Sequence, residues 1–282
     1  MGILIVTRGS EKYPQVLEDL PIPPDPLYML GDASVLDCRS VSIVGTREPT
    51  PYGIRTARMM ATAFARAGIC VVSGMARGVD AIAHRSALET DAPTIAVLGT
   101  GIDVPYPAGH ADLHRAIAKN GLVVSENGPG NKAHKGAFPK RNRIIAALSP
   151  VTIVIEGGHT SGAIITAKQA LELGRTVAAV PGPIDSPQSQ GTNQLLRDGA
   201  VVIATVDDAL TLVGAPSAAP LRPYQLSEVD GSVWSALAVG PLTIDSLSRK
   251  TSLTPRDCLT AITSLEIQGM VESLLTGEVR RR

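Results

Sequence analysis

Short apolar runs recur along residues 41–204 and alternate with longer stretches of helical periodicity. The runs are rich in Val and Ile and apolar at successive positions, which is typical of parallel strands buried on both faces. They predict strands at 41–44, 69–72, 94–98, 122–124, 151–155, 176–180 and 201–204. The intervening stretches predict helices at 54–67, 79–89, 112–119, 141–148, 163–173 and 193–198. This alternation predicts an α/β fold, with a doubly wound, mostly parallel sheet over residues 41–212.

The two ends of the chain do not follow this alternation. Residues 1–40 form a lead-in that we expect to pack on the main domain, with a short helix at 14–20, a proline-rich segment at 21–26 and a possible edge strand at 27–30. Residues 213–225, rich in Ala, Pro and Ser, are typical of a linker. Residues 226–282 predict helices at 233–238, at 244–250 and from Thr254 onward, then a hairpin of 270–275 with 278–281. Three helices followed by a hairpin resemble a winged helix.

Composition limits the partners that such a chain can have. The 282 residues balance 26 Lys and Arg against 26 Asp and Glu, so any site for a polyanion must be local. The three cysteines and five histidines show no metal-ligand spacing, and the cysteine usage favours a reducing cytoplasm. No apolar run is long enough to cross a bilayer, and residues 3–6 lack the basic start and the length of a signal peptide. We therefore expect a cytoplasmic protein with no metal and no membrane contact.

One segment has a strong local excess of positive charge. No acidic residue occurs between Asn127 and Ile155, and the first half of this segment holds five cations, Lys132, Lys135, Lys140, Arg141 and Arg143. Phe138, one of only two Phe, lies among them, and we expect Pro139 to hold its ring in an extended segment rather than in a helix. A base could stack on that ring. A solvated surface is the simpler alternative, but the basic run with an aromatic favours a polyanion site.

The loops after the predicted strands are made of small residues. Ligands of open α/β sheets bind beyond the carboxyl ends of the strands, and here those ends carry Arg47 in Gly-Thr-Arg and Arg77 in Ser-Gly-Met-Ala-Arg-Gly. Backbone N–H groups together with guanidinium suit phosphates. Residues 157–162 match the glycine spacing of a phosphate-binding loop, but Ala163 and Ile164 replace its Lys and Ser/Thr. This indicates anion binding without nucleotide hydrolysis, and the GxGxxG fingerprint of dinucleotide binding is absent.

Two pairs of ionisable residues leave an enzymatic interpretation open. Asp80 and His84 are four residues apart on one predicted helix, with Ser73 near in sequence, and could form a hydrolase site or only hydrogen-bond to orient the turn. Glu126 and Glu156 end strands that we expect to be neighbours, and could form a catalytic carboxylate pair or only brace loop amides and arginines. The structural alternative is the more common one in both cases.

Long motifs give the chain a family resemblance. VSIVGTR, VVSGMARGVDAIAH, TIAVLGTGIDVPYP, FPKRNRIIAALS and SGAIITAKQALELGR lie within a match from about Tyr13 to Ala204 that is similar to the DNA-processing protein A (DprA/Smf) family. The resemblance implies an extended Rossmann-like domain that binds single-stranded DNA, usually as a homodimer. Such proteins protect the strand and help to load the RecA recombinase in natural transformation or repair. The resemblance therefore implies a protein that is not an enzyme, and the family is not known to need a metal or a nucleotide cofactor. The C-terminal unit matches the family's winged-helix-like domain only loosely.

The same resemblance implies the residues that contact DNA. Phe138 would stack a base, Ser161 and Gly162 would donate at a helix start, and the other contacts would come from Arg47, Ser73, Gly74, Arg77, Lys135, Lys140, Arg141, Asn142 and Arg143. Many relatives begin with an additional helical SAM-like domain, for which we expect this N-terminus to be too short. The Gly157-Gly158 pair resembles the nucleotide-binding domains of the lysine-decarboxylase-like Rossmann superfamily, although their PGGxGTxxE signature is missing. The alternative function is therefore a nucleotide-binding enzyme or sensor of that superfamily that acts on a glycosidic bond. A third possibility is that residues 226–282 bind duplex DNA.

Overall fold

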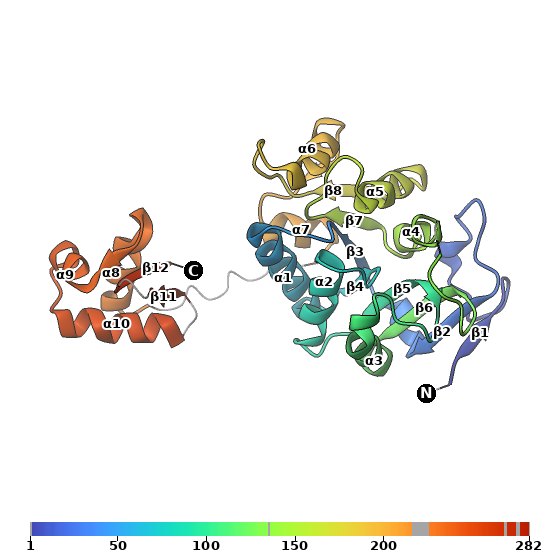
Figure 1. The fold of residues 1–282 in the computed structure, drawn as a ribbon, viewed down its shortest axis with the longest axis horizontal. Coiled ribbons are helices and arrows are strands. Elements are labelled where there is room, and N and C mark those ends of the chain that lie inside the picture. Colours follow the sequence, from blue (N-terminus) through green and yellow to red (C-terminus); the bar gives the residue numbers. More distant parts are fainter. Residues whose placement is uncertain (1, 135, 216–225, 268–269, 275–276, 282) are drawn as a thin grey trace. The chain divides into compact units, whose positions relative to one another are not determined.

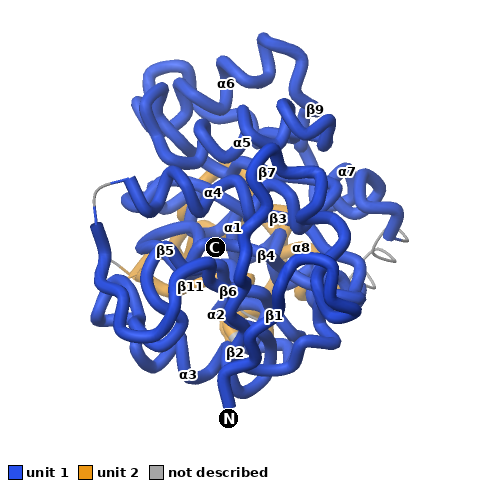
Figure 2. Tube along the Cα trace, turned by 90° about the vertical axis from the view of Figure 1, so that its right-hand side faces the viewer, with its two compact units in different colours: residues 1–218 blue, residues 219–282 orange. Residues whose placement is uncertain are grey.

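The chain forms two compact units, residues 1–218 and residues 219–282 (Figures 1 and 2). The structure is a computed structural model that describes residues 2–134, 136–215, 226–267, 270–274 and 277–281. The linker expected at 213–225 lies mostly outside these residues. We describe each unit by itself.

The first unit is built on a nine-stranded sheet with the order β1-β2-β6-β5-β4-β3-β7-β8-β9. The strands are β1 (Leu4–Val6), β2 (Leu27–Gly31), β3 (Ser40–Val44), β4 (Cys70–Ser73), β5 (Thr94–Gly101), β6 (Leu122–Asn127), β7 (Val151–Val154), β8 (Thr176–Ala179) and β9 (Val201–Val202). All pairs among β3 to β9 are parallel, whereas β1 and β2 are antiparallel additions. Strands β4 and β7 flank β3 on opposite sides, so the sheet is doubly wound, as the sequence predicts.

Helices cover both faces of this sheet (Figure 1). They are α1 (Pro51–Arg66), α2 (Val79–Leu88), α3 (Ala111–Asn120), α4 (Ala137–Leu148), α5 (Gly162–Glu172), α6 (Gln190–Arg197) and α7 (Val206–Leu212), with short 3-10 turns at Gln15–Leu17, Ala33–Asp37, Ala108–His110 and Pro187–Ser189. Consecutive side chains of a strand point to opposite faces. Ile43 therefore packs with α1, α2 and α7, and Val44 packs with α4, α5 and α6.

The lead-in differs from its prediction. Strand β2 is not an edge strand, because it pairs with β6 on one side and with β1 on the other. Only a 3-10 turn, Gln15–Leu17, forms where a helix was expected at 14–20. Tyr13 and Leu17 are buried beside it, and the Tyr13 hydroxyl donates to the Pro24 carbonyl at 2.8 Å. The lead-in thus supplies two strands to the sheet and several buried residues to its core.

The start of α4 also differs from its prediction. Helix α4 begins at Ala137, so Phe138 and Pro139 lie in its first turn and not in an extended segment. Proline is tolerated in a first turn because the N–H groups there have no partner within the helix. The helix therefore fixes the direction of the Phe138 side chain.

The second unit has the winged-helix arrangement that the sequence predicts. Helices α8 (Glu228–Ala236), α9 (Ile244–Thr251) and α10 (Pro255–Ile267) pack around a common core, with a 3-10 turn at Leu237–Val239. Strands β11 (Val271–Ser273) and β12 (Glu278–Arg281) form the expected hairpin, and β10 (Leu242–Thr243) pairs with β12. None of the helices in the described ranges of either unit is long and apolar enough to cross a membrane.

Candidate nucleic-acid interface

The first cleft lies at the carboxyl ends of β3 and β7. Its volume is about 540 Å³, and its lining includes Thr46 and Arg47 after β3, Phe138 and Asn142 of α4, and Ser161 and Gly162 at the start of α5. The strand order reverses between these two strands, which is where open α/β sheets place ligand sites. The cleft thus forms where the topology favours it.

A second cleft, of about 380 Å³, adjoins the first. Arg47, Phe138 and Arg141 line both clefts, and the second adds Arg77, Tyr106 and Glu48. Arg47 and Arg77 are exposed, so both guanidinium groups are open to an anion. The structure therefore brings together two of the predicted arginines, although they follow different strands.

Two aromatic rings lie where the clefts meet. The rings of Tyr106 and Phe138 have their centroids 4.8 Å apart at an angle of 35°, and the Arg47 guanidinium carbon lies 5.7 Å from the Phe138 centroid. Tyr106 is 42% exposed. Sequence reasoning did not select this residue, and the available signal was an aromatic side chain between two prolines after a strand, in Val-Pro-Tyr-Pro. The cluster presents π faces and positive charge together.

The start of α5 supplies a different kind of donor. Ser161 is the N-cap, and its Oγ accepts the Ala163 N–H at 3.2 Å. The hydroxyl hydrogen of Ser161 is not used in that bond, and the amides of the first turn carry the positive end of the helix dipole. Since Ser161 and Gly162 both line the first cleft, this end of α5 can bind an anion.

A buried pair of opposite charges braces the floor of the clefts. The Asp80 carboxylate accepts the N–H groups of Gly74 at 3.1 Å and of Ala76 at 3.4 Å, and the Arg141 guanidinium donates to the carbonyls of Gly74, at 2.6 Å, and of Val97. Burial raises the pKa of the Asp80 carboxyl and lowers the pKa of Arg141 to about 10. Arg141 is only 4% exposed, so it works mainly as a scaffold of the floor.

These contacts resolve the enzymatic interpretation of Asp80 and His84. Asp80 orients the turn after β4, which confirms the structural alternative. His84 is fully buried, and its Nδ1 pairs with Thr94 Oγ1 at 2.8 Å. Ser73 is buried as well, and its hydroxyl donates to the Ile43 carbonyl at 2.6 Å. In this conformation neither the Ser73 hydroxyl nor the Gly74 amide is free to meet a ligand.

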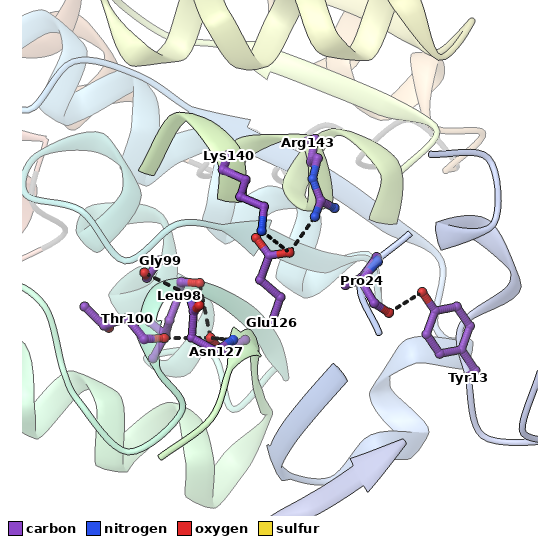
Figure 3. Close-up of polar contacts among 10 residues, drawn as sticks. Tyr13, Pro24, Leu98, Gly99, Thr100, Glu126, Asn127, Lys140 and Arg143 are labelled. Atoms are coloured by element: carbon purple, nitrogen blue, oxygen red, sulfur yellow. Dashed lines mark hydrogen bonds and ion pairs between the residues drawn. The ribbon is translucent and has the colours of Figure 1, made fainter. Parts of the chain in front are cut away.

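Two predicted cations of α4 lie on a different side of that helix. Lys140 Nζ and Arg143 Nη2 contact Glu126 Oε2 at 3.3 Å and 2.5 Å, and Figure 3 shows both side chains reaching that carboxylate. Neither residue lines either cleft. The remaining predicted cation, Lys135, lies outside the described residues. Asn142 lines the first cleft, and its Nδ2 donates to the Gly162 carbonyl at 3.2 Å, which ties α4 to α5.

Glu126 and Glu156 do not form a carboxylate pair. The expectation that their strands are neighbours is wrong, because β5, β4 and β3 lie between β6 and β7. The Glu156 carboxylate accepts the Thr50 N–H at 2.9 Å and the Thr50 hydroxyl at 2.5 Å, and so braces the start of α1. Within the part of the chain that the structure describes, no group of three or more His, Cys, Asp and Glu side chains is placed to hold a metal ion.

Two family models match this chain. One, for DNA recombination-mediator protein A, covers residues 4–214, and the other, for the DprA winged helix domain, covers residues 216–275. The putative DNA processing protein DprA of Mycobacterium tuberculosis (strain CDC 1551 / Oshkosh) is 40% identical over 87% of this chain and 66% of its own length. Protein Smf of Synechocystis is 42% identical over 74% of this chain. The chain spans 66% and 54% of the lengths of these two relatives.

Two solved structures share the fold. DNA processing protein A from Streptococcus pneumoniae has a TM-score of 0.71 at 36% identity, over 74% of each chain. DNA processing protein A from Helicobacter pylori, whose structure concerns its mode of binding single-stranded DNA, has a TM-score of 0.69 at 32% identity, over 76% of this chain and 97% of its own. The matching domains, the relatives and the shared fold show that this chain belongs to the DprA/Smf family of DNA-processing proteins.

Proposed function

We propose that this protein is a single-stranded DNA-binding recombination mediator that protects the strand and helps to load a RecA-type recombinase. The observation that carries the proposal is the cluster of Arg47, Phe138 and Tyr106 between two clefts at the carboxyl ends of the sheet. The Helicobacter pylori relative, described as binding single-stranded DNA, supports the same ligand class.

The chemistry of the clefts supports a preference for single strands. In a duplex the faces of the bases are covered by their neighbours, whereas a single strand can offer a base to the Phe138 ring. Arg47, Arg77 and the amides at the start of α5 would bind phosphates. These contacts read neither base edges nor sequence, so binding should tolerate all sequences.

We further propose that the protein acts as a homodimer in the cytoplasm and that it is not an enzyme. Glu126 and Glu156, the carboxylates that a glycosidic-bond mechanism would use, are both held in internal contacts, which disfavours the alternative of a nucleotide-binding enzyme. The free thiols of Cys38, Cys70 and Cys258 suit a reducing compartment.

A fluorescence-anisotropy titration with a labelled single-stranded oligonucleotide tests the ligand class. Unlabelled duplex of the same sequence serves as competitor. If about four phosphates are neutralised, log K should fall against log[salt] with a slope near −3. Weak competition by duplex and a salt slope of that size are expected. Equal competition by duplex, or affinity that does not change with salt, would overturn the assignment. The rate at which a RecA-type recombinase forms filaments on strands first bound by this protein then tests loading. If filaments form no faster than on bare strands, the loading part of the proposal is refuted.

A further inference from the structure

The outer face of α1 carries an unusual row of positive charge. Residues 49–79 contain four arginines and no acidic residue. Three of these arginines, Arg55, Arg58 and Arg66, belong to α1, and all three are exposed. The chain as a whole balances 26 Lys and Arg against 26 Asp and Glu, but this balance conceals a second basic surface that is separate from the segment at 127–155.

The packing of α1 explains why these arginines face outward together. Gly53, Thr56, Ala57, Met60, Ala61 and Phe64 form its buried face. At 3.6 residues per turn, Arg55, Arg58 and Arg66 fall on the opposite face in one row. From Arg55 to Arg66 the row is about 16 Å long at 1.5 Å per residue, which equals about five stacked-base steps of 3.4 Å and fewer nucleotides of an extended strand.

The arginines of this row are not engaged within the protein. Among the described residues, no ion pair or side-chain hydrogen bond involves Arg55, Arg58 or Arg66. Lys140 and Arg143 are different, because both contact the Glu126 carboxylate. Cations that no carboxylate holds keep their charge available for a partner.

The row begins beside the first cleft. Thr50, the N-cap of α1, is bonded to Glu156 directly after β7, and Arg47 lies three residues before it. Tyr52, one turn before Arg55, donates its hydroxyl to the Pro181 carbonyl at 3.1 Å, just beyond β8. Exposed apolar groups accompany the arginines, since Ile54 is 39% and Met59 is 50% exposed. A strand that leaves the cleft would meet phosphate-binding and base-binding groups in succession.

We propose that the outer face of α1 is a second binding track, on which single-stranded DNA continues after it leaves the clefts. The inference rests on the proposed function of the clefts and extends it from a few nucleotides to a longer strand. Guanidinium groups spaced along a helix, with exposed apolar side chains beside them, fit a flexible polyanion with exposed bases.

The test compares short and long oligothymidylates, of about five and about twenty nucleotides, on the variant R55Q/R58Q/R66Q. The variant should bind the short strand like wild type, because the clefts are unchanged. It should bind the long strand about tenfold more weakly at low salt. For the long strand, the slope of log K against log[salt] should be less steep by about 2, because each of three lost phosphate contacts contributes about 0.7. The matched control K12Q/K119Q/R197Q removes three exposed cations elsewhere and should bind both strands like wild type.

Three outcomes would overturn the track. These are an unchanged affinity of R55Q/R58Q/R66Q for the long strand, an equal loss for both strand lengths, or an equal loss in the control variant. If wild type does not bind the short strand at all, the proposed function of the clefts fails, and that result is distinct from failure of the track. The single variant Arg58→Glu keeps the test available if the triple variant does not fold, since a reversed charge should weaken long-strand binding alone.

Discussion

The guanidinium carbon of Arg47 lies 5.7 Å from the centroid of the Phe138 ring, which joins the end of β3 to the start of α4. A cation at this distance is attracted to the face of the ring. The contact orients both groups before a ligand arrives. We expect the two residues to act as one unit.

A double-mutant cycle on Arg47 and Phe138 tests this coupling. Phe138→Ala should weaken single-strand binding by about 1–3 kcal/mol through lost stacking. Arg47→Ala should weaken binding to all sequences alike and reduce the salt slope by about 0.7. The double variant should lose less than the sum of the two, by about 0.5–1 kcal/mol, because each single change already breaks the cation–π contact. Additive losses in anisotropy titrations would show that the residues act independently.

Tyr106 is expected to contribute through its ring and not through its hydroxyl. Tyr106→Phe keeps the ring against Phe138, so binding of single-stranded DNA should stay within about twofold of wild type, whereas Tyr106→Ala should cost about 1 kcal/mol or more. The pair of variants is its own control, since both remove the hydroxyl and only one removes the ring. Equal losses in the two variants would assign the role to the hydroxyl.

Glu126 is expected to matter for stability more than for DNA binding. Its side chain is 8% exposed and that of Arg143 is 14% exposed, so removal of Glu126 leaves the largely buried Arg143 without its carboxylate, and removal of Arg143 leaves Glu126 only the exposed Lys140. Glu126→Ala or Arg143→Ala should lower the free energy of unfolding by about 3 kcal/mol. Lys140→Ala, whose side chain is 61% exposed, should change stability by well under 1 kcal/mol. Urea unfolding measures these changes.

The same variants also test whether Lys140 and Arg143 contact DNA or only Glu126. Lys140 and Arg143 were predicted to contact DNA. If the contacts to Glu126 persist when DNA binds, folded Arg143→Ala protein should bind single-stranded DNA like wild type at equal active concentration. A loss of affinity with unchanged stability would restore these residues to the interface.

Much of the fold could be predicted because its central strands are buried on both faces. Their unbroken Val and Ile runs identified the strands from 41 onward, and glycines marked several helix ends. Strand β2 was expected at 27–30, but as an edge strand, and the three-residue strand β1 that covers it was missed because it is too short to show a periodicity. The start of α4 was missed because Pro139 was interpreted as a breaker, although the first turn tolerates it.

The residues of the site could be predicted from the sequence, but the side chains that they contact could not. Arg47, Arg77 and Phe138 could be selected because they follow strand ends or lie in a basic run. Which carboxylate neutralises which cation depends on strand order, and β6 and β7 are consecutive among the strands of the chain but far apart in the sheet. The pairing of Glu126 with Arg143 and the burial of Arg141 under the clefts therefore required the tertiary structure.

His84 should make the fold sensitive to acid. Burial, together with the charges of Arg141 and His110, lowers the pKa of His84 from 6.5 to about 3. Above pH 6.5 the residue is neutral in both states and adds no pH dependence. Between pH 6.5 and 3 only the unfolded chain takes up this proton, so the free energy of unfolding falls as the pH falls. The loss amounts to about 2 kcal/mol by about pH 5.

His84→Gln isolates this contribution. The buried Asp80 has the opposite sign, since its pKa is raised and its protonation in the folded state is favoured at low pH. The free energy of unfolding is therefore measured by urea unfolding at pH 7.5 and at pH 5 for both proteins, and the two changes with pH are compared. The variant should lose about 2 kcal/mol less than wild type between these pH values. His159→Gln, on the exposed turn before α5, controls for the loss of a surface histidine. Parallel losses in wild type and His84→Gln would contradict the assignment.

Gly74 is expected to tolerate no side chain. A Cβ at this position would lie 2.6–2.7 Å from the guanidinium atoms of Arg141, which are held by the Gly74 and Val97 carbonyls and cannot retreat into solvent. Gly74→Ala should therefore displace Arg141, lower the free energy of unfolding by about 1–3 kcal/mol, and weaken single-strand binding because the floor shared by both clefts moves. Gly109→Ala is the matched control, because a Cβ there meets nothing within 4 Å. If Gly74→Ala binds DNA like wild type despite its lower stability, the Asp80 and Arg141 brace serves only the fold, and the interface must depend on the exposed arginines and aromatic rings alone.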